Sequence, residues 1–186
     1  AKYHFIIIQL MQVFKFGGAS VKDAEGVKNL VKIVQNYPKN NLLIVVSAMG
    51  KTTNKLEELT SAYIKRDEVM HLLFDEVKAF HFEIITELFK DQTNPIYDDV
   101  ANTFVEIEWL LEEEASDSPD YLYDQIVSIG ELVSTKIVAA YLNLVGIFSI
   151  WTDARNYIQT DNNYRNANVI WDKTEQEIQK HLPNFL

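Results

Sequence analysis

The sequence predicts an α/β fold of three layers, with helices on both faces of a largely parallel central sheet. Three short apolar runs are typical of strands: Gln12 to Phe16, Asn41 to Val46 and Ile147 to Trp151. They lack the alternation of a half-exposed strand, which indicates strands buried on both faces. The first two runs each end in a turn that bears Gly or Ser and are followed by a helical pattern, as in parallel sheets.

The apolar segment that leads into the first strand, from Phe5 to Phe14, is also expected to be extended. It is too short to span a bilayer and lacks a small-residue cleavage site. We therefore treat it as a strand, and the net charge of −10 argues against an anionic membrane as a partner. At the other end, Phe185 and Leu186 are expected to begin a further strand.

A helix is expected after the first turn, because one apolar face recurs at i, i+3, i+4 and i+7. This face comprises Val27, Leu30, Val31 and Val34. Pro38 ends the helix, since proline disfavours helical geometry in the residue before it.

A helical insertion, about residues 54–120, follows the second strand. Its pattern starts at Leu56 and continues to about Phe89 as two helices. A further helix is expected from about Ile96 to Ala115. No internal repeat or low-complexity linker divides the chain, so the sequence predicts one domain.

The next helix, about Tyr121 to Leu144, follows a start signal that ends in Pro119. It carries two apolar rows, which indicates burial on two sides. Glu131 lies in the second row, whereas a helical glutamate is more commonly a solvated surface residue. An unpaired buried carboxylate is costly, so we expect Glu131 to have a cationic partner.

Composition and charge limit the classes of function. The 186 residues are 47% apolar and 24% charged, as in an ordinary soluble domain. The net charge of −10 argues against a nucleic-acid partner, because phosphate contacts need clustered Lys and Arg. Twelve carboxylates and no Lys or Arg lie between Lys90 and Lys136, which is typical of a solvated helical surface. The absence of cysteine excludes thiolate metal sites and fits a reducing cytoplasm.

The turn after the first strand suits a phosphate group. Gly17 and Gly18 let the backbone approach a ligand closely, and the following helix start offers unpaired N–H groups. Lys15 adds a mobile positive charge and Ser20 a hydroxyl. The alternative is a structural Gly-Gly turn.

The turn after the second strand, Ser47 to Asn54, contains Gly50-Lys51-Thr52. A Walker A loop needs a further glycine where Val45 stands, so that interpretation fails. What remains is a hydroxyl-rich turn at the carboxyl end of a strand, where ligands bind in open α/β sheets.

Two arginines, Arg155 and Arg165, follow the third predicted strand. Each has the geometry to grip a carboxylate through two hydrogen bonds. Taken alone, each is more typical of a surface ion pair.

The runs KFGGASV, VVSAMGKTTN, SIGELVSTKIVAAYL and WTDARNYIQTD together resemble aspartate kinases of the amino acid kinase superfamily. The resemblance covers about residues 12–170, and its first two blocks are highly specific to that family. It implies that residues 1–186 are the N-terminal, amino-acid-binding part of an amino acid kinase domain. We expect the nucleotide-binding half and the regulatory domains to lie outside this chain.

The resemblance assigns roles position by position. It implies that Lys15 is catalytic and contacts the transferred phosphoryl group, and that Ser47 and Thr53 help to hold the amino acid. Glu131 receives the ammonium group of the substrate. The residues that line the phosphate and ATP path are Lys15, Gly17, Gly18 and Ser20.

The arginine for the substrate α-carboxylate departs from the family pattern. By straight count it falls on Asn166, and Arg165 lies one place earlier. Either the loop shifts by one residue or Arg155 takes the role.

The implied reaction transfers the γ-phosphoryl group of ATP to the β-carboxylate of L-aspartate. It gives 4-phospho-L-aspartate, the first step of lysine, threonine and methionine biosynthesis. The attacking carboxylate is ionised at neutral pH, since the ordinary pKa of an aspartate side chain is about 3.9, and needs no general base. ATP would bring Mg²⁺ with it, and no protein metal site is expected. The resemblance and the missing cysteines imply a cytoplasmic enzyme, and an uncovered sheet edge favours a homodimer.

Two other functions stay open at this stage. Another amino acid kinase, such as an acetylglutamate kinase, would bind an acylated amine that offers no positive charge to Glu131. A non-catalytic fragment would bind aspartate without turning over ATP.

Overall fold

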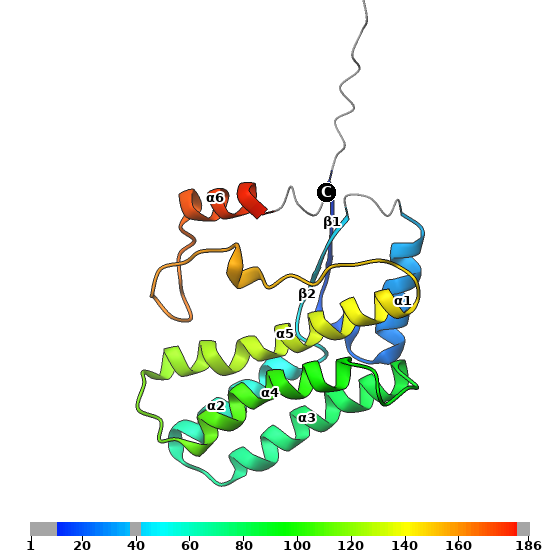
Figure 1. Cartoon of the computed structure of the whole chain (residues 1–186). Coiled ribbons are helices and arrows are strands. Elements are labelled where there is room, and N and C mark those ends of the chain that lie inside the picture. The colour runs from blue at the N-terminus through cyan, green and yellow to red at the C-terminus, as the bar shows by residue number, and fades with distance from the viewer. Residues whose placement is uncertain (1–10, 38–41, 182–186) are drawn as a thin grey trace, which may run out of the picture.

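The computed structural model describes residues 11–37 and 42–181, which form a mostly helical α/β fold around one parallel strand pair (Figure 1). This confirms the predicted fold class. The strands are β1 (Gln12–Phe16) and β2 (Leu42–Val46). The α-helices are α1 (Ala24–Gln35), α2 (Thr52–Lys65), α3 (Val69–Leu88), α4 (Ile96–Glu112), α5 (Pro119–Leu144) and α6 (Trp171–His181). Two short 3₁₀ helices are η1 (Gly18–Val21) and η2 (Ala154–Asn156).

The strands β1 and β2 pair in parallel, with Phe16 opposite Val46 at their carboxyl ends. Buried and exposed residues alternate along the strands although apolar and polar residues do not. The reason is that helices of the described part of the chain cover only one face of the strand pair. Phe16 and Val46 are buried on that face, while Val13 and Val45 are 58% and 44% exposed on the other. The predicted covering of both faces is thus not provided by the described residues.

Helix α1 begins at a capped end. The carboxylate of Asp23 accepts a hydrogen bond of 2.8 Å from the N–H of Gly26, which satisfies one of the unpaired donors of the first turn. The predicted face of α1 is buried as expected. Its buried residues are Ala24, Val27, Leu30, Val31 and Val34.

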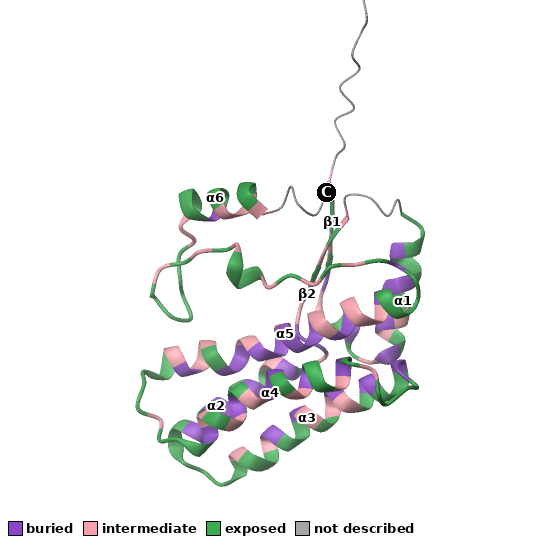
Figure 2. Ribbon diagram, viewed as in Figure 1, coloured by how far each residue is buried: buried purple, intermediate pink, exposed green. Residues whose placement is uncertain are grey.

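The helices α2 to α5 pack together beneath the strands, and α5, the longest of them, contributes the most buried residues (Figure 2). The two helices expected between Leu56 and Phe89 are α2 and α3, and both apolar rows predicted for α5 are buried. By length and composition α5 could cross a membrane. More than half of its most apolar stretch is buried against the rest of the chain, as in a soluble core helix.

The third predicted strand, Ile147 to Trp151, does not form one among the described residues. Its polar groups bind α5 instead of β2: the side chain of Asn143 accepts from the N–H of Ser149 at 3.0 Å and donates to its C=O at 2.9 Å. The indole of Trp151 donates to the hydroxyl of Thr135 at 2.9 Å. A segment held to a helix by side chains in this way does not join the strand ladder.

Other predictions differ in extent or lie outside the described residues. The predictions that lie outside the described residues are the extended segment up to Leu10, the helix end at Pro38, the strand start at Asn41 and the strand expected at Phe185. Helix α6 was not predicted, because only two of its residues, Trp171 and Ile178, are apolar. Thr174 is its one buried residue within the described part.

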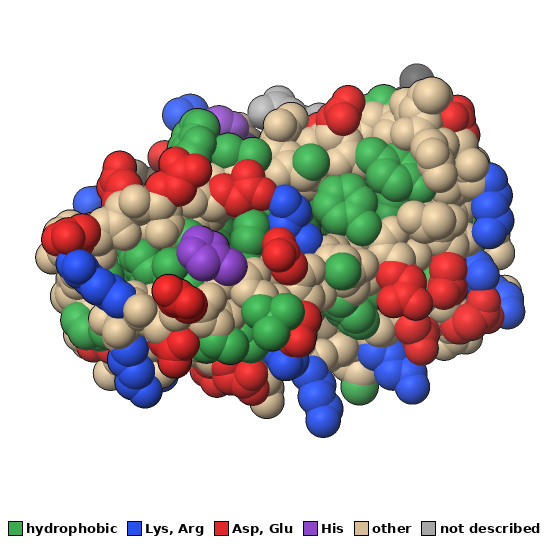
Figure 3. Space-filling view, turned by 90° about the horizontal axis from the view of Figure 1, so that it is seen from below, with side chains coloured by type: hydrophobic (Ala, Val, Ile, Leu, Met, Phe, Trp, Pro, Cys, Tyr) green, Lys and Arg blue, Asp and Glu red, His purple; other side chains and the backbone are tan. Residues whose placement is uncertain are grey.

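The acid-rich stretch of α4 and α5 forms a solvated surface, as predicted. The carboxylates of Asp98, Asp99 and Glu112 are exposed. Figure 3 shows charged side chains of both signs interspersed with apolar ones on the face seen from below. Ion pairs that join the helices include Lys55–Glu76 at 3.0 Å.

His81 of α3 is the most buried titratable group of the described core, with no exposed surface. Its Nδ1 lies 2.8 Å from the carbonyl oxygen of Val77. Burial lowers its pKa from 6.5 to about 4, against a small opposing effect of that bond.

Because the unfolded chain takes up a proton on this histidine near pH 6.5 and the folded chain only near pH 4, stability is lost as the pH falls through this window. We expect His81 to account for a loss of up to about 3 kcal/mol of unfolding free energy between pH 6.5 and 4. Urea unfolding at several pH values measures it. The slope should be shallower in His81→Phe and unchanged in the control His71→Gln, since His71 is exposed on the same helix. Equal slopes in all three proteins would contradict the assignment.

Candidate functional site

The candidate site lies where the carboxyl ends of β1 and β2 meet. Since the strands are parallel and in register, the loops that follow them leave from the same edge. The N–H of Ser47 donates to the carbonyl of Phe16 at 3.0 Å, and the N–H of Gly50 donates to the carbonyl of Gly18 at 3.0 Å. The two loops predicted to bind phosphate and amino acid are therefore joined by their backbones.

Gly18 makes this approach possible. A Cβ atom at this position would stand 2.6 Å from the carbonyl oxygen of Ala48 and 2.9 Å from that of Gly50. Only a residue without a side chain fits there. The second glycine of the motif thus has a demonstrable structural role in addition to its predicted place on the phosphate path.

Lys15, at the end of β1, is exposed. Its Nζ lies 3.6 Å from the point at which a Cβ atom on Gly17 would stand, so the ammonium group lies beside the glycine turn. Ser20 is also exposed, and its N–H donates to the carbonyl of Gly17 at 2.8 Å. The structure brings together all four residues predicted for the phosphate path.

Helix α5 bonds to the loop after β2 at two successive residues. The hydroxyl of Ser134 donates to the carbonyl of Ser47 at 2.7 Å, and a carboxylate oxygen of Glu131 accepts a long hydrogen bond of 3.4 Å from the N–H of Ala48. Gly130 permits this packing, because a Cβ atom there would meet the side chains of Thr52 and Ala48 at 3.1 and 3.2 Å.

Glu131 is half-buried, and this burial raises the pKa of its carboxyl, opposed by the hydrogen bond from Ala48. The predicted cationic partner is not present: no ion pair to Glu131 occurs within residues 11–37 and 42–181. The backbone N–H of Ala48 replaces it in part. The carboxylate therefore keeps capacity for a positively charged group.

Thr53, in the first turn of α2, is half-buried beside this loop. Its neighbour Thr52 closes the preceding turn, because its hydroxyl donates to the carbonyl of Met49 at 2.6 Å. Ser47, Thr53 and Glu131, the three residues predicted to hold the amino acid, thus belong to elements that touch one another.

Arg155 is paired with Asp153. Its Nε and Nη2 donate to the carboxylate at 2.7–3.0 Å, and these bonds hold the pKa of Asp153 below its usual range although burial acts in the opposite direction. The guanidinium group is therefore engaged within the chain and does not pair with Glu131.

Arg165 lies near the start of α5. Its guanidinium stands 4.0 Å from the ring centroid of Tyr123, and its N–H donates to Asp124 at 3.0 Å. Its backbone is left-handed, with φ of 62°. Tyr123 precedes Glu131 by eight residues, which is roughly 12 Å along a helix. The structure does not bring Arg165 to Glu131.

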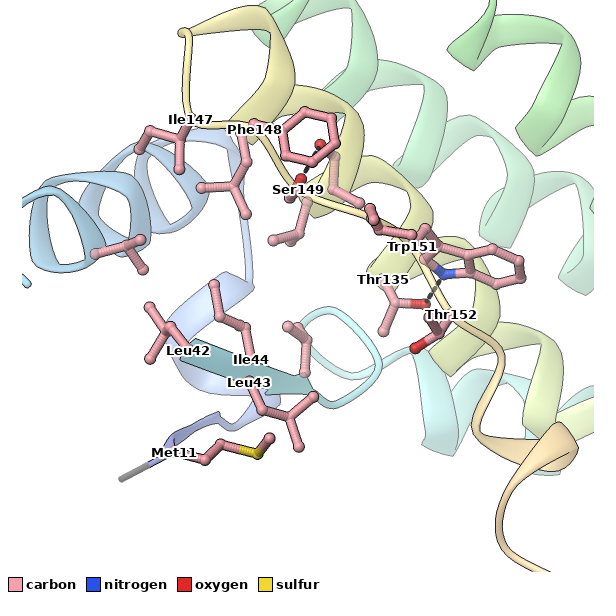
Figure 4. Close-up of a pocket in the computed structure, with 16 residues that line it drawn as sticks. Met11, Leu42, Leu43, Ile44, Thr135, Ile147, Phe148, Ser149, Trp151 and Thr152 are labelled. Carbon is pink, nitrogen blue, oxygen red and sulfur yellow. Dashed lines mark hydrogen bonds between the residues drawn. The ribbon is translucent and has the colours of Figure 1, made fainter. Parts of the chain in front are cut away.

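A hollow of the described surface lies at a different place. It has a volume of about 270 Å³ and lies between β2, the second half of α5 and residues 147–152 (Figure 4). Apolar side chains dominate it, with Thr135, Ser149 and Thr152 at its edge. None of the predicted site residues lines it.

Sequence reasoning missed two contacts of this region. The pattern places Ser134 in an apolar row of α5 without indicating a role, although a buried hydroxyl requires a partner. The stack in which Tyr123 donates to Glu57 at 2.5 Å beneath Arg165 had no local signal, because its members are far apart in sequence.

The chain is similar to proteins of known family. The amino acid kinase family matches residues 11–184. Aspartokinase 1, chloroplastic, of Arabidopsis thaliana is 34% identical over 180 residues, which are 91% of this chain and 30% of that protein. Lysine-sensitive aspartokinase 3 of Escherichia coli is 29% identical over 155 residues, which are 83% of this chain and 33% of that protein.

Solved structures agree. Escherichia coli aspartokinase III, in complex with lysine and aspartate and in complex with aspartate and ADP, gives a TM-score of 0.83 at 26% identity. Each comparison covers 94% of this chain and 38% of the other. The chain spans about a third of the length of these relatives.

Gly18 and Gly17 offer a matched test of the loop contact. Gly18→Ala should lower the unfolding free energy by about 2 kcal/mol, the scale of overpacking, because the new methyl group meets two backbone oxygens. Gly17→Ala should change it by less than about 0.5 kcal/mol, since its φ of −77° suits alanine and its nearest contact is the flexible end of Lys15. Urea unfolding measures both, and equal losses would refute the assigned contact.

Proposed function

Because this chain belongs to the amino acid kinase family, we propose that it carries the amino-acid-binding half of an aspartate kinase. Such an enzyme transfers the γ-phosphoryl group of ATP to the β-carboxylate of L-aspartate and gives 4-phospho-L-aspartate. The similarity to aspartokinases of a plant and a bacterium supports this proposal. This activity is proposed for a whole enzyme. The present chain spans about a third of the length of the related aspartokinases.

The observation that carries the proposal is the carboxylate of Glu131. It is half-buried, has no cationic side chain beside it among the described residues, and bonds to the loop that holds Ser47. A substrate ammonium group would supply the missing positive charge. Ser47 and Thr53 would add polar contacts, which leaves the β-carboxylate of a bound aspartate free to react.

The phosphate side of the proposal rests on Lys15 and the glycine turn. The reaction holds two anions in line while charge spreads over the moving phosphoryl oxygens, so it needs positive charge and N–H donors. Lys15, with Gly17, Gly18 and Ser20, offers these groups. Because the described residues contain no group of three His, Asp or Glu side chains that could hold a metal ion, Mg²⁺ would be held by the phosphates of ATP, whose charge it partly neutralises. A carboxylate nucleophile is already ionised, so no residue has to remove a proton.

The partner of the substrate α-carboxylate is Arg155 or Arg165. In the structure Arg155 pairs with Asp153, and Arg165 lies against Tyr123. For either to reach a ligand at Glu131, the segment after Trp151 would have to rearrange. Comparing aspartate affinity in Arg155→Met and Arg165→Met would identify the residue that binds.

A second candidate function is aspartate binding without turnover of ATP. It rests on Glu131 alone, because that half-buried carboxylate favours a positively charged ligand whether or not a phosphate binds beside it. An acetylglutamate kinase is less well supported, because an acylated amine would leave the charge of Glu131 unpaired.

Hydroxylamine trapping of an acyl phosphate tests the proposal. The purified chain is incubated with MgATP and with aspartate, glutamate or acetylglutamate in parallel. Hydroxamate from aspartate alone would establish the reaction and a working nucleotide site in this chain. If no hydroxamate forms, calorimetry shows whether the chain binds aspartate. The absence of binding would refute the proposed site.

Glu131→Gln should weaken aspartate binding by about 1.5–3 kcal/mol, the scale of a charge-assisted hydrogen bond. In the unmodified chain, binding should also weaken as the pH falls through the raised pKa of Glu131, because the protonated carboxyl no longer attracts an ammonium group. The variant should lack this dependence. Glu83→Gln, on the exposed side of α3, is the control in calorimetry. Equal affinity of the Glu131 variant would contradict the assignment.

Lys15→Ala should lower turnover by about a hundredfold or more, by analogy with the removal of one transition-state donor. The loss should fall mainly on the rate constant. The rate constant is measured by hydroxamate formation. If the present chain forms no hydroxamate, the substitution is tested in a longer chain that does. Lys32→Ala, an exposed lysine on α1, should leave the rate unchanged. Unchanged turnover without Lys15 would remove it from the catalytic role.

A further inference from the structure

The turn from Met49 to Thr53 rests on two neighbouring side chains of α3. The Cζ atom of Phe80 lies 3.4 Å from the point at which a Cβ atom on Gly50 would stand, so the end of the ring packs directly against that glycine. The Nε2 atom of His81 lies 3.5 Å from the hydroxyl oxygen of Thr52. These contacts come from a helix to which neither the motifs nor the resemblance assigned a role.

The orientation of the His81 ring is determined by its surroundings. The bond of 2.8 Å to the carbonyl of Val77 requires a proton on Nδ1, which leaves the lone pair of Nε2 directed at Thr52. The rings of Phe80 and Phe104 pack edge-on at centroid distances of 5.1 and 5.6 Å. The ring has no exposed surface among these neighbours.

His81 meets the hydroxyl group that closes the turn. The hydroxyl of Thr52 has one hydrogen and two nearby acceptors, the carbonyl of Met49 at 2.6 Å and Nε2 of His81 at 3.5 Å. The N–H of Thr52 also donates to the carbonyl of Met49, at 3.0 Å. The ring therefore lies against the hydroxyl group of Thr52, which closes the turn by donating to the carbonyl of Met49.

This turn connects the two halves of the candidate site. Just before it, the N–H of Ala48 donates to Glu131, and within it the N–H of Gly50 donates to the carbonyl of Gly18. A displacement of the turn would therefore change the position of the ammonium-binding carboxylate relative to the phosphate loop.

We infer that Phe80 and His81 are positioning residues, which hold the Met49–Thr53 turn through Gly50 and Thr52 and so set the spacing of the two ligand loops. Both residues lie on α3, outside the two ligand loops. Their effect on aspartate affinity rests on the proposed function, whereas their effect on the turn does not.

Hydrogen–deuterium exchange of the full chain without ligand tests the effect on the turn. In His81→Leu, amides of residues 47–54 should exchange about fivefold faster relative to those of α5, because the ring that packs against Thr52 is lost. His81→Gln keeps a polar group near Thr52 and should restore most of the protection. His71→Leu, an exposed histidine on the same helix, should leave exchange unchanged.

A double-mutant cycle separates positioning from general packing. Thr52→Val removes the hydroxyl that His81 meets and nearly keeps the side-chain shape. If His81 acts through this hydroxyl, the two substitutions should not add. The exchange rate of the turn in the double variant with His81→Leu should then be at most about twice that of the faster single variant. If His81→Leu does not fold, His81→Phe, which also removes the Nε2 atom that faces Thr52, takes its place in the cycle.

Calorimetry with aspartate gives the second measurement. His81→Leu should weaken binding by about fivefold and His81→Gln should restore it. If the unmodified chain binds no aspartate, the proposed function fails, and exchange still decides the inference. Exchange that rises equally in the turn and in α5, or fully additive effects in the cycle, would overturn the positioning role.

Discussion

The candidate site depends on the contact between α5 and the loop that follows β2. Ser134 bonds to the carbonyl of Ser47 and Glu131 accepts from the N–H of Ala48, so a long core helix and a strand end are joined at successive backbone groups. Burial of α5 supplies the free energy that holds this geometry, because its apolar rows pack between α2 and α4. The polar contacts determine where the helix meets the loop.

Charge at the site is distributed unequally, and this inequality is informative. The cations of Arg155 and Arg165 are engaged with side chains of the chain itself, whereas the half-buried carboxylate of Glu131 has only a long bond from a neutral amide. A carboxylate in partial burial gains more from a cation than an exposed one does, because the effective dielectric constant is lower. Ligand binding is therefore favoured at Glu131 more than at either arginine as they now lie.

The sequence predicted what depends on local pattern. The helices that contain Val27, Leu56 and Ile126 followed from apolar periodicity, and the two ligand loops followed from the glycine and serine turns after short strands. What it did not predict depends on long-range competition. Residues 147–151 are apolar except for Ser149, but side-chain bonds to Asn143 and Thr135 hold them to α5. The place of Arg165 depends on a tyrosine 42 positions earlier, which no local motif reveals.

The two ligand loops are spaced by backbone contacts, and this has a consequence for the proposed chemistry. Two anions that repel each other have to be held at a fixed separation, which flexible side chains alone do poorly. Here the absence of a side chain at Gly18 lets one loop touch the other directly, and the bond from Gly50 locks that contact. Lys15 and Glu131 then extend from a joined framework, so each has to orient only one charged group of its own ligand. The requirement for glycine thus follows from the distance between the two ligands as much as from access to phosphate.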